Sequence, residues 1–359
     1  MNNKRIIAMH LPQYYPFPEN DEWWGKGFTE WRNVAKAKPR FRNHYQPHLP
    51  SDLGFYDLRL PECRIEQEKL ATEYGIYGFC YYHYWFNGHV IMEKPVEMKL
   101  ANPEEKMPFI FCWANEDWHR NWEGGFNVKL LEQKYSEEDD IAHFNYLLPY
   151  FKDSRYIRIN NKPILVLYKI HYIPNLDRMI ETFQTEAKKN GFELYICKME
   201  SAGNQGKEWM KKGIDASIDF QPIHSETYLS KITIANALHF LFKKDLYPKH
   251  YSYAELVKKA CKLLNSDYKL YPCCCPMWDN SCRRVGRPYT AYIGSTPSLF
   301  KKWFKYIYET FKPYSKDENL IFINAWNEWA EGCHLEPDLK HGRAYLEVIK
   351  EVVDEYNYE

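Results

Sequence analysis

Short apolar runs alternate with longer amphipathic or polar segments along the whole chain. Apolar runs of this length are typical of buried strands in a parallel sheet, and the segments between them are typical of helices. The expected strands are Arg5–His10, Ile76–Tyr82, Phe109–Trp113, Ile164–Tyr168, Leu194–Met199, Ala216–Phe220, Pro272–Met277 and Leu320–Ala325. The expected helices include Pro61–Tyr74, Glu137–Phe151, Leu176–Asn190, Tyr253–Leu264 and Ser298–Phe311. This alternation predicts an α/β fold.

Eight strands that alternate with helices fit either a closed (β/α)8 TIM barrel or an open doubly wound sheet. An open sheet would bind nucleotides through a glycine-rich turn after its first strand, whereas this chain has His10-Leu-Pro-Gln-Tyr-Tyr-Pro there. We therefore expect a TIM barrel, formed by a single catalytic domain over residues 1–359. Two loop insertions are expected, at about 21–52 as a wall or lid of a cleft, and at about 223–270 with an extra helix over Thr233–Phe242.

Composition narrows the class of protein. Lys+Arg and Asp+Glu both number 48, so a net charge of zero gives no electrostatic reason to expect a nucleic-acid or acidic-membrane partner. No window of about 18 apolar residues exists to span a membrane, and no secretory signal peptide is recognisable. The chain has 10 cysteines without paired C-x-x-C spacing, which predicts buried free thiols in a cytoplasmic protein rather than disulfides or a zinc site. Those inside apolar runs are Cys80, Cys112, Cys197, Cys273, Cys274 and Cys275.

The segment Asn324–Asp338 carries the clearest candidate chemistry. It follows the last expected strand and places Glu328 and Glu331 three residues apart, between Trp326, Trp329 and a glycine. One-turn spacing brings two side chains to the same side of the chain, with Cβ atoms roughly 5–6 Å apart. Retaining glycosidases hold their two catalytic carboxyl groups about 5–5.5 Å apart. The pair therefore predicts acid–base chemistry on a glycoside, although two solvated glutamates on a short helix would show the same spacing.

Other polar and aromatic residues follow the ends of the expected strands. Active sites of TIM barrels lie at the carboxyl ends of the strands, so these side chains should meet in one pocket that suits a polyhydroxylated ligand. The aromatic fraction of 17% supports such a pocket, because sugar faces stack on aromatic rings. The candidate substrate-binding residues are His10, Gln13, Tyr14, Tyr81, His83, Trp85, Trp113, Asn115, Glu116, Trp118, Tyr168, Glu200, Gln221, Trp278, Asp279, Asn280, Trp326, Asn327 and Trp329.

Each candidate also has a structural interpretation. His10 and His83 taken alone are more typical of buried histidines with hydrogen-bonded ring nitrogens than of catalytic histidines. The tryptophans are equally compatible with packing inside the barrel. Glu336 and Asp338 are expected at the surface or in secondary contacts. Arg283 is expected in solvent, with a contact to an anionic sugar or phosphate as the alternative.

Six motifs of this chain resemble the WbsX family. They are Leu11-Pro-Gln-Tyr-Tyr-Pro, Trp23-Trp24-Gly with Gly27-Phe-Thr-Glu-Trp31, Pro47-His48-Leu-Pro50, Trp113-Ala-Asn-Glu-Asp-Trp118, Trp278-Asp-Asn280 and Asn324-Ala-Trp-Asn-Glu-Trp-Ala-Glu-Gly332. The resemblance covers nearly the whole chain. Members of that family are often described as glycosyltransferases or lipopolysaccharide biosynthesis proteins.

The WbsX family is similar in turn to glycoside hydrolase family 99, whose endo-α-mannosidases and mannanases are (β/α)8 barrels that need no cofactor. The catalytic motif Glu-Trp-His-Glu-Gly of those enzymes corresponds to Glu328-Trp-Ala-Glu-Gly332 here. The resemblance implies that Glu328 is the general base, acting through the substrate's own 2-hydroxyl, and that Glu331 is the general acid. Configuration would be retained, on an α-linked glycan of bacterial polysaccharide or O-antigen type. Ala330 replaces the family's histidine, so the mannoside substrate does not carry over.

Two other functions remain open from the sequence. One is a glycosyltransferase or transglycosylase of lipopolysaccharide biosynthesis, although the chain has no glycine-rich nucleotide-binding turn and no D-x-D motif. The other is a non-catalytic carbohydrate-binding protein. In each case the expected partner is an oligo- or polysaccharide, and no metal or other cofactor is expected.

Overall fold

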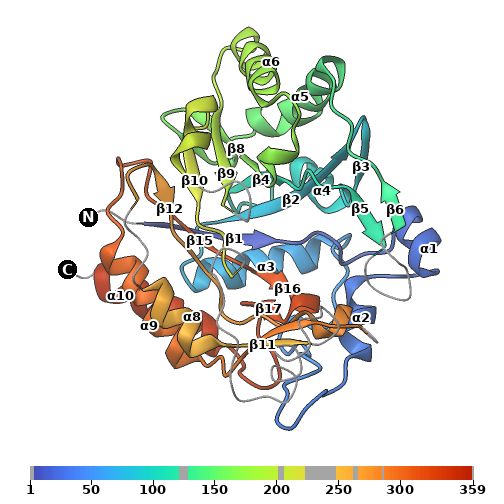
Figure 1. The fold of residues 1–359 in the computed structure, drawn as a ribbon, viewed down its shortest axis with the longest axis vertical. Coiled ribbons are helices and arrows are strands. Elements are labelled where there is room, and N and C mark those ends of the chain that lie inside the picture. Colours follow the sequence, from blue (N-terminus) through green and yellow to red (C-terminus); the bar gives the residue numbers. More distant parts are fainter. Residues whose placement is uncertain are drawn as a thin grey trace.

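The computed structural model describes residues 4–120, 128–200, 206–222, 248–261, 266–284 and 287–357. Its centre is a nearly closed barrel of nine short parallel strands, with helices on the outside (Figure 1). This confirms the expected TIM-barrel architecture. In spatial order the barrel strands are β12 (Leu270–Tyr271), β10 (Ala216–Ile218), β9 (Tyr195–Met199), β8 (Lys162–Leu167), β4 (Phe109–Trp113), β2 (Gly78–Phe86), β1 (Arg5–His10), β15 (Leu320–Ile323) and β13 (Cys273–Cys274).

The barrel closes through strands β12 and β13, which are consecutive in sequence and separated only by Pro272. β12 pairs with β10 on one side, and β13 pairs with β15 on the other. Proline has no backbone N–H, so it interrupts the ladder of hydrogen bonds. Its carbonyl still accepts the N–H of Phe322 at 2.8 Å. The seventh expected strand, Pro272–Met277, is present only as β13, and β12 lies just before the expected range.

Helices cover the outside of the barrel. Figure 1 shows α5 and α6 side by side at the top of the view, and α8, α9 and α10 gathered at the lower left. The Ser136 hydroxyl accepts the N–H of Asp139 at 3.1 Å and caps α5, whose first turn is acidic, as a helix N-terminus favours. The helices are α3 (Pro61–Glu73), α4 (Lys94–Ala101), α5 (Glu137–Lys152), α6 (Leu176–Lys189), α8 (Tyr253–Ala260), α9 (Pro297–Thr310) and α10 (Ala344–Asn357).

The two expected insertions differ in how much of them is described. The first contains α1 (Pro18–Trp24) and α2 (Glu30–Lys36), and an isolated bridge between Pro50 and Asp338 joins its end to the C-terminal part of the chain. Residues 223–247 and 262–265 of the second, including the expected helix Thr233–Phe242, lie outside the described residues. Its described part contains α8 and β11 (Lys249–Ser252), which pairs in parallel with β14 (Thr290–Ile293).

Short strands and 3-10 helices lie in the segments between the barrel strands and the helices. The additional strands are β3 (His89–Ile91), β5 (Trp118–Arg120), β6 (Val128–Leu131), β7 (Arg158–Ile159), β16 (Asn327–Glu328) and β17 (Cys333–His334). The short 3-10 helices are Ile170–Tyr172, Lys207–Lys212, Asn280–Arg283 and Trp329–Glu331. Within the described ranges, no helix combines the length and the apolar character needed to cross a membrane.

Cysteine thiols form part of the barrel core. Cys80 of β2 and Cys112 of β4 are fully buried, and burial raises the pKa of the Cys80 thiol well above its ordinary value. Cys197 and Cys273 lie in the same interior and are also buried. All 10 cysteines are free. The six cysteines expected inside apolar runs are all buried, as small hydrophobic side chains are.

Candidate active site

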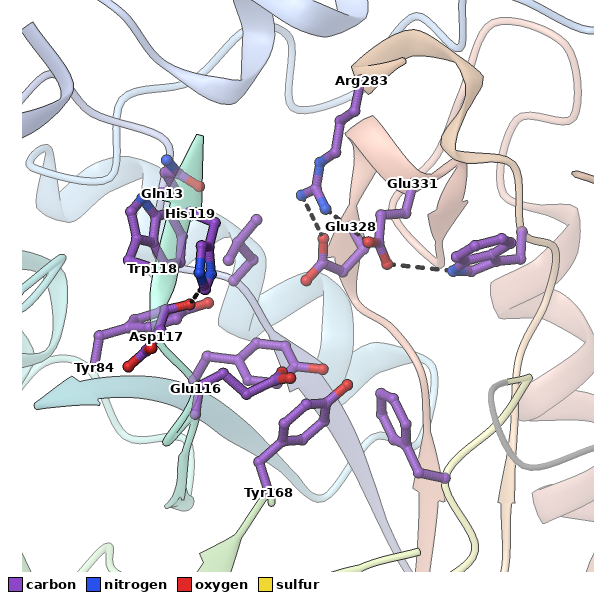
Figure 2. Close-up of a pocket in the computed structure, with 15 residues that line it drawn as sticks. Gln13, Tyr84, Glu116, Asp117, Trp118, His119, Tyr168, Arg283, Glu328 and Glu331 are labelled. Carbon is purple, nitrogen blue, oxygen red and sulfur yellow. Dashed lines mark hydrogen bonds and ion pairs between the residues drawn. The ribbon is translucent and has the colours of Figure 1, made fainter. Parts of the chain in front are cut away.

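A cavity of about 320 Å³ opens at the carboxyl ends of the barrel strands (Figure 2). Every strand of a parallel barrel ends at the same rim, so residues far apart in sequence meet there. The cavity is lined by Leu11, Gln13, Tyr82, Tyr84, Ala114, Glu116, Asp117, Trp118, His119, Tyr168, Phe220, Trp278, Arg283, Glu328 and Glu331.

One guanidinium, that of Arg283, contacts all three carboxylates of this region, and 12% of the Arg283 side chain is exposed. Arg283 donates from Nη2 to Glu328 Oε2 at 3.0 Å and from Nη1 to Glu331 Oε1 at 2.7 Å. Its Nε donates to Glu30 Oε2 at 3.2 Å, and Glu30 is fully buried on α2. Figure 2 shows Arg283 reaching down between Glu328 and Glu331. The planar fork of an arginine therefore holds the two candidate catalytic carboxylates together.

The environment of Glu328 favours its protonated form. Burial and the negative charge of Glu331 raise the pKa of Glu328 from its ordinary value of 4.5 to about 8, against the opposing effect of Arg283. Glu30 raises it further. Burial also raises the pKa of Glu30, opposed by Arg283. Three carboxylates share one guanidinium here, so full ionisation would leave negative charges without a counter-charge in a poorly solvated cluster. This favours retention of a proton at neutral pH.

Glu331 is more open to solvent than Glu328, with side-chain exposures of 27% and 8%. Its second oxygen, Oε2, accepts the indole N–H of Trp278 at 3.2 Å. Its backbone carbonyl accepts the N–H of Asp279 at 2.6 Å. Glu331 is thus held by the segment after β13 through both its side chain and its main chain, and it faces the open part of the cavity.

The chain turns sharply between the two glutamates and β17. β16 pairs antiparallel with β17, and Glu328 lies opposite Cys333. Gly332 closes the short helix Trp329–Glu331 in the left-handed region with φ +53, and a Cβ there would lie 3.0 Å from the carbonyl oxygen of Asp279. Only glycine fits this turn without strain. The glycine of the motif therefore brings Glu331 against the β13 segment.

The wall opposite the carboxylates is polar and aromatic. Figure 2 shows Gln13, Tyr84, Trp118 and His119 across the cavity from Glu331. Burial raises the pKa of Tyr84 well above its ordinary value, and so does the charge of Glu328. Tyr84 is therefore a hydrogen-bond donor at any physiological pH. A wall of this kind suits a ligand with several hydroxyl groups and apolar faces.

Seven residues predicted from the sequence line the cavity together. They are Glu328, Glu331, Gln13, Glu116, Trp118, Tyr168 and Trp278. The structure brings them from five barrel strands or the loops that follow them, as the argument from strand ends required.

Strand β2 contributes different residues from those predicted. It was expected to end at Tyr82 but continues to Phe86, so the aromatic run after Tyr81 lies inside a strand instead of beyond it. Successive side chains of a strand point to opposite faces. Tyr82 and Tyr84 therefore line the cavity.

The alternate residues of β2 point away from the cavity and pack under α5. The Trp85 ring stacks on His143 with centroids 4.7 Å apart, and His83 Nε2 lies 2.8 Å from His143 Nε2. The ring of Trp113, on β4, contacts the same histidine edge to face, with ring centroids 4.6 Å apart. Tyr81, His83, Trp85 and Trp113 are buried core residues here, since none of them reaches the cavity wall.

Five other predicted residues lie beneath the carboxylates and not in the cavity wall. They are His10, Tyr14, Trp326, Asn327 and Trp329. Asn327 joins β16 to the end of β1, because its Oδ1 accepts the N–H of Leu11 at 2.7 Å and its Nδ2 donates to the Leu11 carbonyl at 3.0 Å. The Tyr14 hydroxyl donates to the Asn327 carbonyl at 2.5 Å. These residues fix the backbone that carries Glu328.

The remaining predicted residues hold loops around the rim and lie outside the cavity wall. Asn115 donates to the Lys169 carbonyl at 2.8 Å, and Glu200 accepts the Lys198 ammonium at 2.8 Å. The carboxylate of Asp279 lies 2.6 Å from His44 Nε2. Asn280 and Gln221 also form hydrogen bonds to nearby residues. Asn280 Oδ1 accepts the backbone N–H of Thr290, and Gln221 Nε2 donates to the Asp219 carboxylate.

The surface positions expected for Arg283, Glu336 and Asp338 were wrong, and for the two acidic residues the alternative of secondary contacts applies. Arg283 is largely enclosed, with 12% of its side chain exposed, because its charge is balanced by three carboxylates, so it is a central residue of the site. Glu336 is 2% exposed and accepts hydrogen bonds from Tyr56, Gln67 and Trp329. Asp338 is also 2% exposed. Buried charges need partners, and partners from distant segments cannot be recognised in the sequence.

The fold and the cavity define an α/β-barrel protein with two neighbouring carboxylates, Glu328 and Glu331, at the carboxyl ends of its strands. The chain belongs to the family described as glycosyltransferase WbsX, whose family model matches residues 6–349. It is 36% identical over 350 residues to the protein named "Uncharacterized protein WxcX" in Xanthomonas campestris pv. campestris, in strain B100 and equally in strain ATCC 33913. The alignment covers 97% of this chain and 49% of each relative, so the chain spans about half the length of these relatives.

Solved structures resemble the fold. A structure described as a glycoside hydrolase-like protein superposes with a TM-score of 0.60 at 13% identity, over 98% of this chain and 94% of that one. The GH99 endo-alpha-mannosidase from Bacteroides thetaiotaomicron superposes with a TM-score of 0.57 at 12% identity, over 100% of this chain and 98% of that one. At these identities the likeness establishes the barrel fold.

Proposed function

We propose that the protein is a retaining glycoside hydrolase that cleaves an α-linked glycan of bacterial polysaccharide or O-antigen type. The observation that carries this proposal is the pair Glu328 and Glu331, joined by Arg283 at the rim of a polar and aromatic cavity. The likeness of the fold to a GH99 endo-alpha-mannosidase supports the class of reaction.

The proposed chemistry needs one protonated and one ionised carboxyl group. The acid protonates the departing glycosidic oxygen, and the base removes the proton of the substrate's 2-hydroxyl, whose oxygen attacks the anomeric carbon. The raised pKa of Glu328 means that the pair keeps one proton near neutral pH, which is the state required. Burial and the charge of Glu331 raise the pKa of Glu328 and favour its protonated form, whereas the family resemblance gives Glu328 the role of base.

The roles can be separated by the leaving group of the substrate. If Glu328 is the base, Glu331→Gln keeps activity on an aryl glycoside with an activated leaving group, because such a group departs without protonation. Glu328→Gln then loses activity on both activated and natural glycans. The opposite pattern assigns proton donation to Glu328 and contradicts the resemblance.

A glycan-library screen with the purified wild type tests the proposal as a whole. Products are analysed for anomeric configuration, which a retaining enzyme preserves. Glu66→Gln, an exposed glutamate of α3, is the matched control and should keep full activity. Unchanged glycoside cleavage in both Glu328→Gln and Glu331→Gln would remove the basis of the assignment.

The family description supports a second candidate, transfer of a sugar to another acceptor. The same pair of carboxylates could catalyse transglycosylation in lipopolysaccharide biosynthesis, with an acceptor hydroxyl in place of water. Products formed in the presence of an acceptor glycan distinguish transglycosylation from hydrolysis, and calorimetry with nucleotide sugars tests a transferase that uses a nucleotide-sugar donor. Tight binding of a nucleotide sugar without glycoside turnover would favour the transferase.

A further inference from the structure

Three ligand-type side chains converge behind the candidate active site. His48, His334 and Asp338 each offer one ligand atom, and these three atoms all lie within 4.8 Å of one another. The two imidazole nitrogens are 2.9 Å apart, and His334 Nε2 is 3.9 Å from Asp338 Oδ2. The three residues are 4%, 1% and 2% exposed.

Hydrogen bonds on the far side of each ring show which nitrogen carries the proton. His334 Nδ1 lies 2.9 Å from the Glu336 carbonyl, and His48 Nε2 lies 3.1 Å from the Tyr45 carbonyl. A carbonyl oxygen can only accept, so both of these nitrogens are N–H donors. In neutral imidazoles the other nitrogen of each ring then bears a lone pair. Two lone pairs therefore face each other at 2.9 Å, which is repulsive unless a cation lies between them.

The carboxylate of Asp338 supplies a third unsatisfied group. Its Oδ1 accepts the backbone N–H groups of Lys340 and His341 at 2.9 and 2.5 Å. Its Oδ2 accepts no hydrogen bond of good geometry from the described residues, and the Tyr45 hydroxyl is the only described donor that interacts with this carboxylate through a side chain. A buried carboxylate oxygen without a donor is costly. Its position beside the two imidazoles indicates that it completes a binding site.

We propose that His48, His334 and Asp338 bind a divalent transition-metal ion, with Zn²⁺ as the best match. Two imidazole nitrogens and one carboxylate oxygen are ligands that zinc takes in proteins. The far-side N–H of each imidazole is bonded to a backbone carbonyl, the arrangement that orients metal-ligating histidines.

An entry path adjoins the cluster. A second cavity of about 290 Å³ is lined by His48, Tyr45, Lys340 and His341, among others. An ion can reach the ligands from that cavity, and a water in it can serve as the fourth ligand of a tetrahedral ion. The Lys340 ammonium stacks on the Tyr45 ring at 4.3 Å, so it is held by the aromatic face.

The ion would connect segments that support the catalytic pair. His334 is the second residue of β17, the strand that directly follows Gly332. Its ring stacks on the Trp329 ring with centroids 3.8 Å apart. His48 belongs to the first insertion, which also contributes Glu30 to Arg283. The proposed role is structural: the ion ties the first insertion to the segment after Glu331. It does not depend on the proposed glycosidase activity.

The test uses tag-free protein expressed in zinc-supplemented medium. We expect elemental analysis to find one zinc per chain. Calorimetry on chelator-treated protein should show one saturable Zn²⁺ site, and Co²⁺ should give visible absorption bands from the same site. Zinc should raise the melting temperature of the stripped protein by about 5 °C or more.

Three variants locate the site. His48→Gln, His334→Gln and Asp338→Asn should each lower Zn²⁺ affinity by about 100-fold or more, since even substitutions outside the ligand set cost 10- to 100-fold. Asp338→Asn changes no volume and covers the case in which a histidine variant fails to fold. His83→Gln is the matched control, because His83 faces His143 at 2.8 Å in another buried pair and neither belongs to the three-residue cluster.

Two results would overturn the proposal. One is the absence of stoichiometric metal together with no saturable binding of Zn²⁺ or Co²⁺ to the wild type. The other is zinc affinity that all three ligand variants leave unchanged. A nitrogen-15 NMR signal of one imidazolium shared between His48 and His334 in metal-free protein, with no zinc uptake, would show that a proton fills the position instead.

Discussion

The buried carboxyl group of Glu328 makes the stability of the protein depend on pH in a defined way. Its pKa is about 8 in the folded protein and 4.5 ordinarily. A carboxyl group with a raised pKa stabilises the fold while it is protonated. That contribution is complete below pH 4.5 and is lost as the pH rises through 8. The rise of the Glu328 pKa from 4.5 to about 8 corresponds to a change of about 5 kcal/mol in the free energy of unfolding.

The variant Glu328→Gln removes this titration and keeps a side chain of the same shape. An amide oxygen can still accept the N–H of Arg283. We expect the variant and the wild type to have similar free energies of unfolding at pH 4. Above pH 8 the variant should be more stable by about 5 kcal/mol, because it never has to ionise a buried group. The catalytic function would then be maintained at a cost in stability.

Urea unfolding at several pH values between 4 and 9 measures the difference directly. At each pH the free energy of unfolding of the wild type is subtracted from that of the variant. The pH dependence of this difference reports the titration of Glu328 and its coupled neighbours. Glu66→Gln serves as the control for loss of an exposed glutamate and should give a difference near zero at every pH. A flat difference curve for Glu328→Gln from pH 4.5 to 8 would refute the electrostatic argument.

Three further outcomes are expected. Arg283→Met leaves the buried Glu30 and Glu328 and the partly exposed Glu331 without their cation. It should lower the free energy of unfolding by about 3–5 kcal/mol at pH 9 and by less at pH 5, where the carboxylates take up protons; urea unfolding at the two pH values checks this. Trp278→Phe removes the N–H that Glu331 accepts, a hydrogen bond that contributes about 1 kcal/mol. We expect kcat/KM on a cleaved glycan to fall several-fold and the melting temperature to fall by no more than about 2–4 °C. Gly332→Ala should destabilise the fold by about 1–3 kcal/mol in thermal unfolding, because φ is +53 and the Asp279 carbonyl blocks the Cβ.

Much of the fold follows from local patterns. The expected strands at Arg5–His10 and Phe109–Trp113 match the observed β1 and β4, because a run of apolar residues can only be satisfied inside the barrel. The buried thiol of Cys112 follows from the same pattern. The pair Glu328 and Glu331 was also recognisable, since both residues lie in one short segment after a strand.

The direction of side chains in β2 was not recognisable from the same pattern. The run Gly78–Phe86 is apolar or aromatic at almost every position, so the sequence has no alternation that marks an inner and an outer face. Only the register against β1 and β4 decides that Tyr82 and Tyr84 face the cavity, while His83 and Trp85 face α5.

The amino-acid sequence by itself determined the order of strands and helices, the buried thiols and the two adjacent glutamates, because these depend on interactions between near neighbours in the chain. Only the tertiary structure decided that Arg283 is largely enclosed, because its partners come from Glu30 and from the motif after β15. The approach of His48 to His334 across 286 positions has the same origin. Closure of the barrel brings such groups together, and the need to balance buried charges and lone pairs then gives each of them its role.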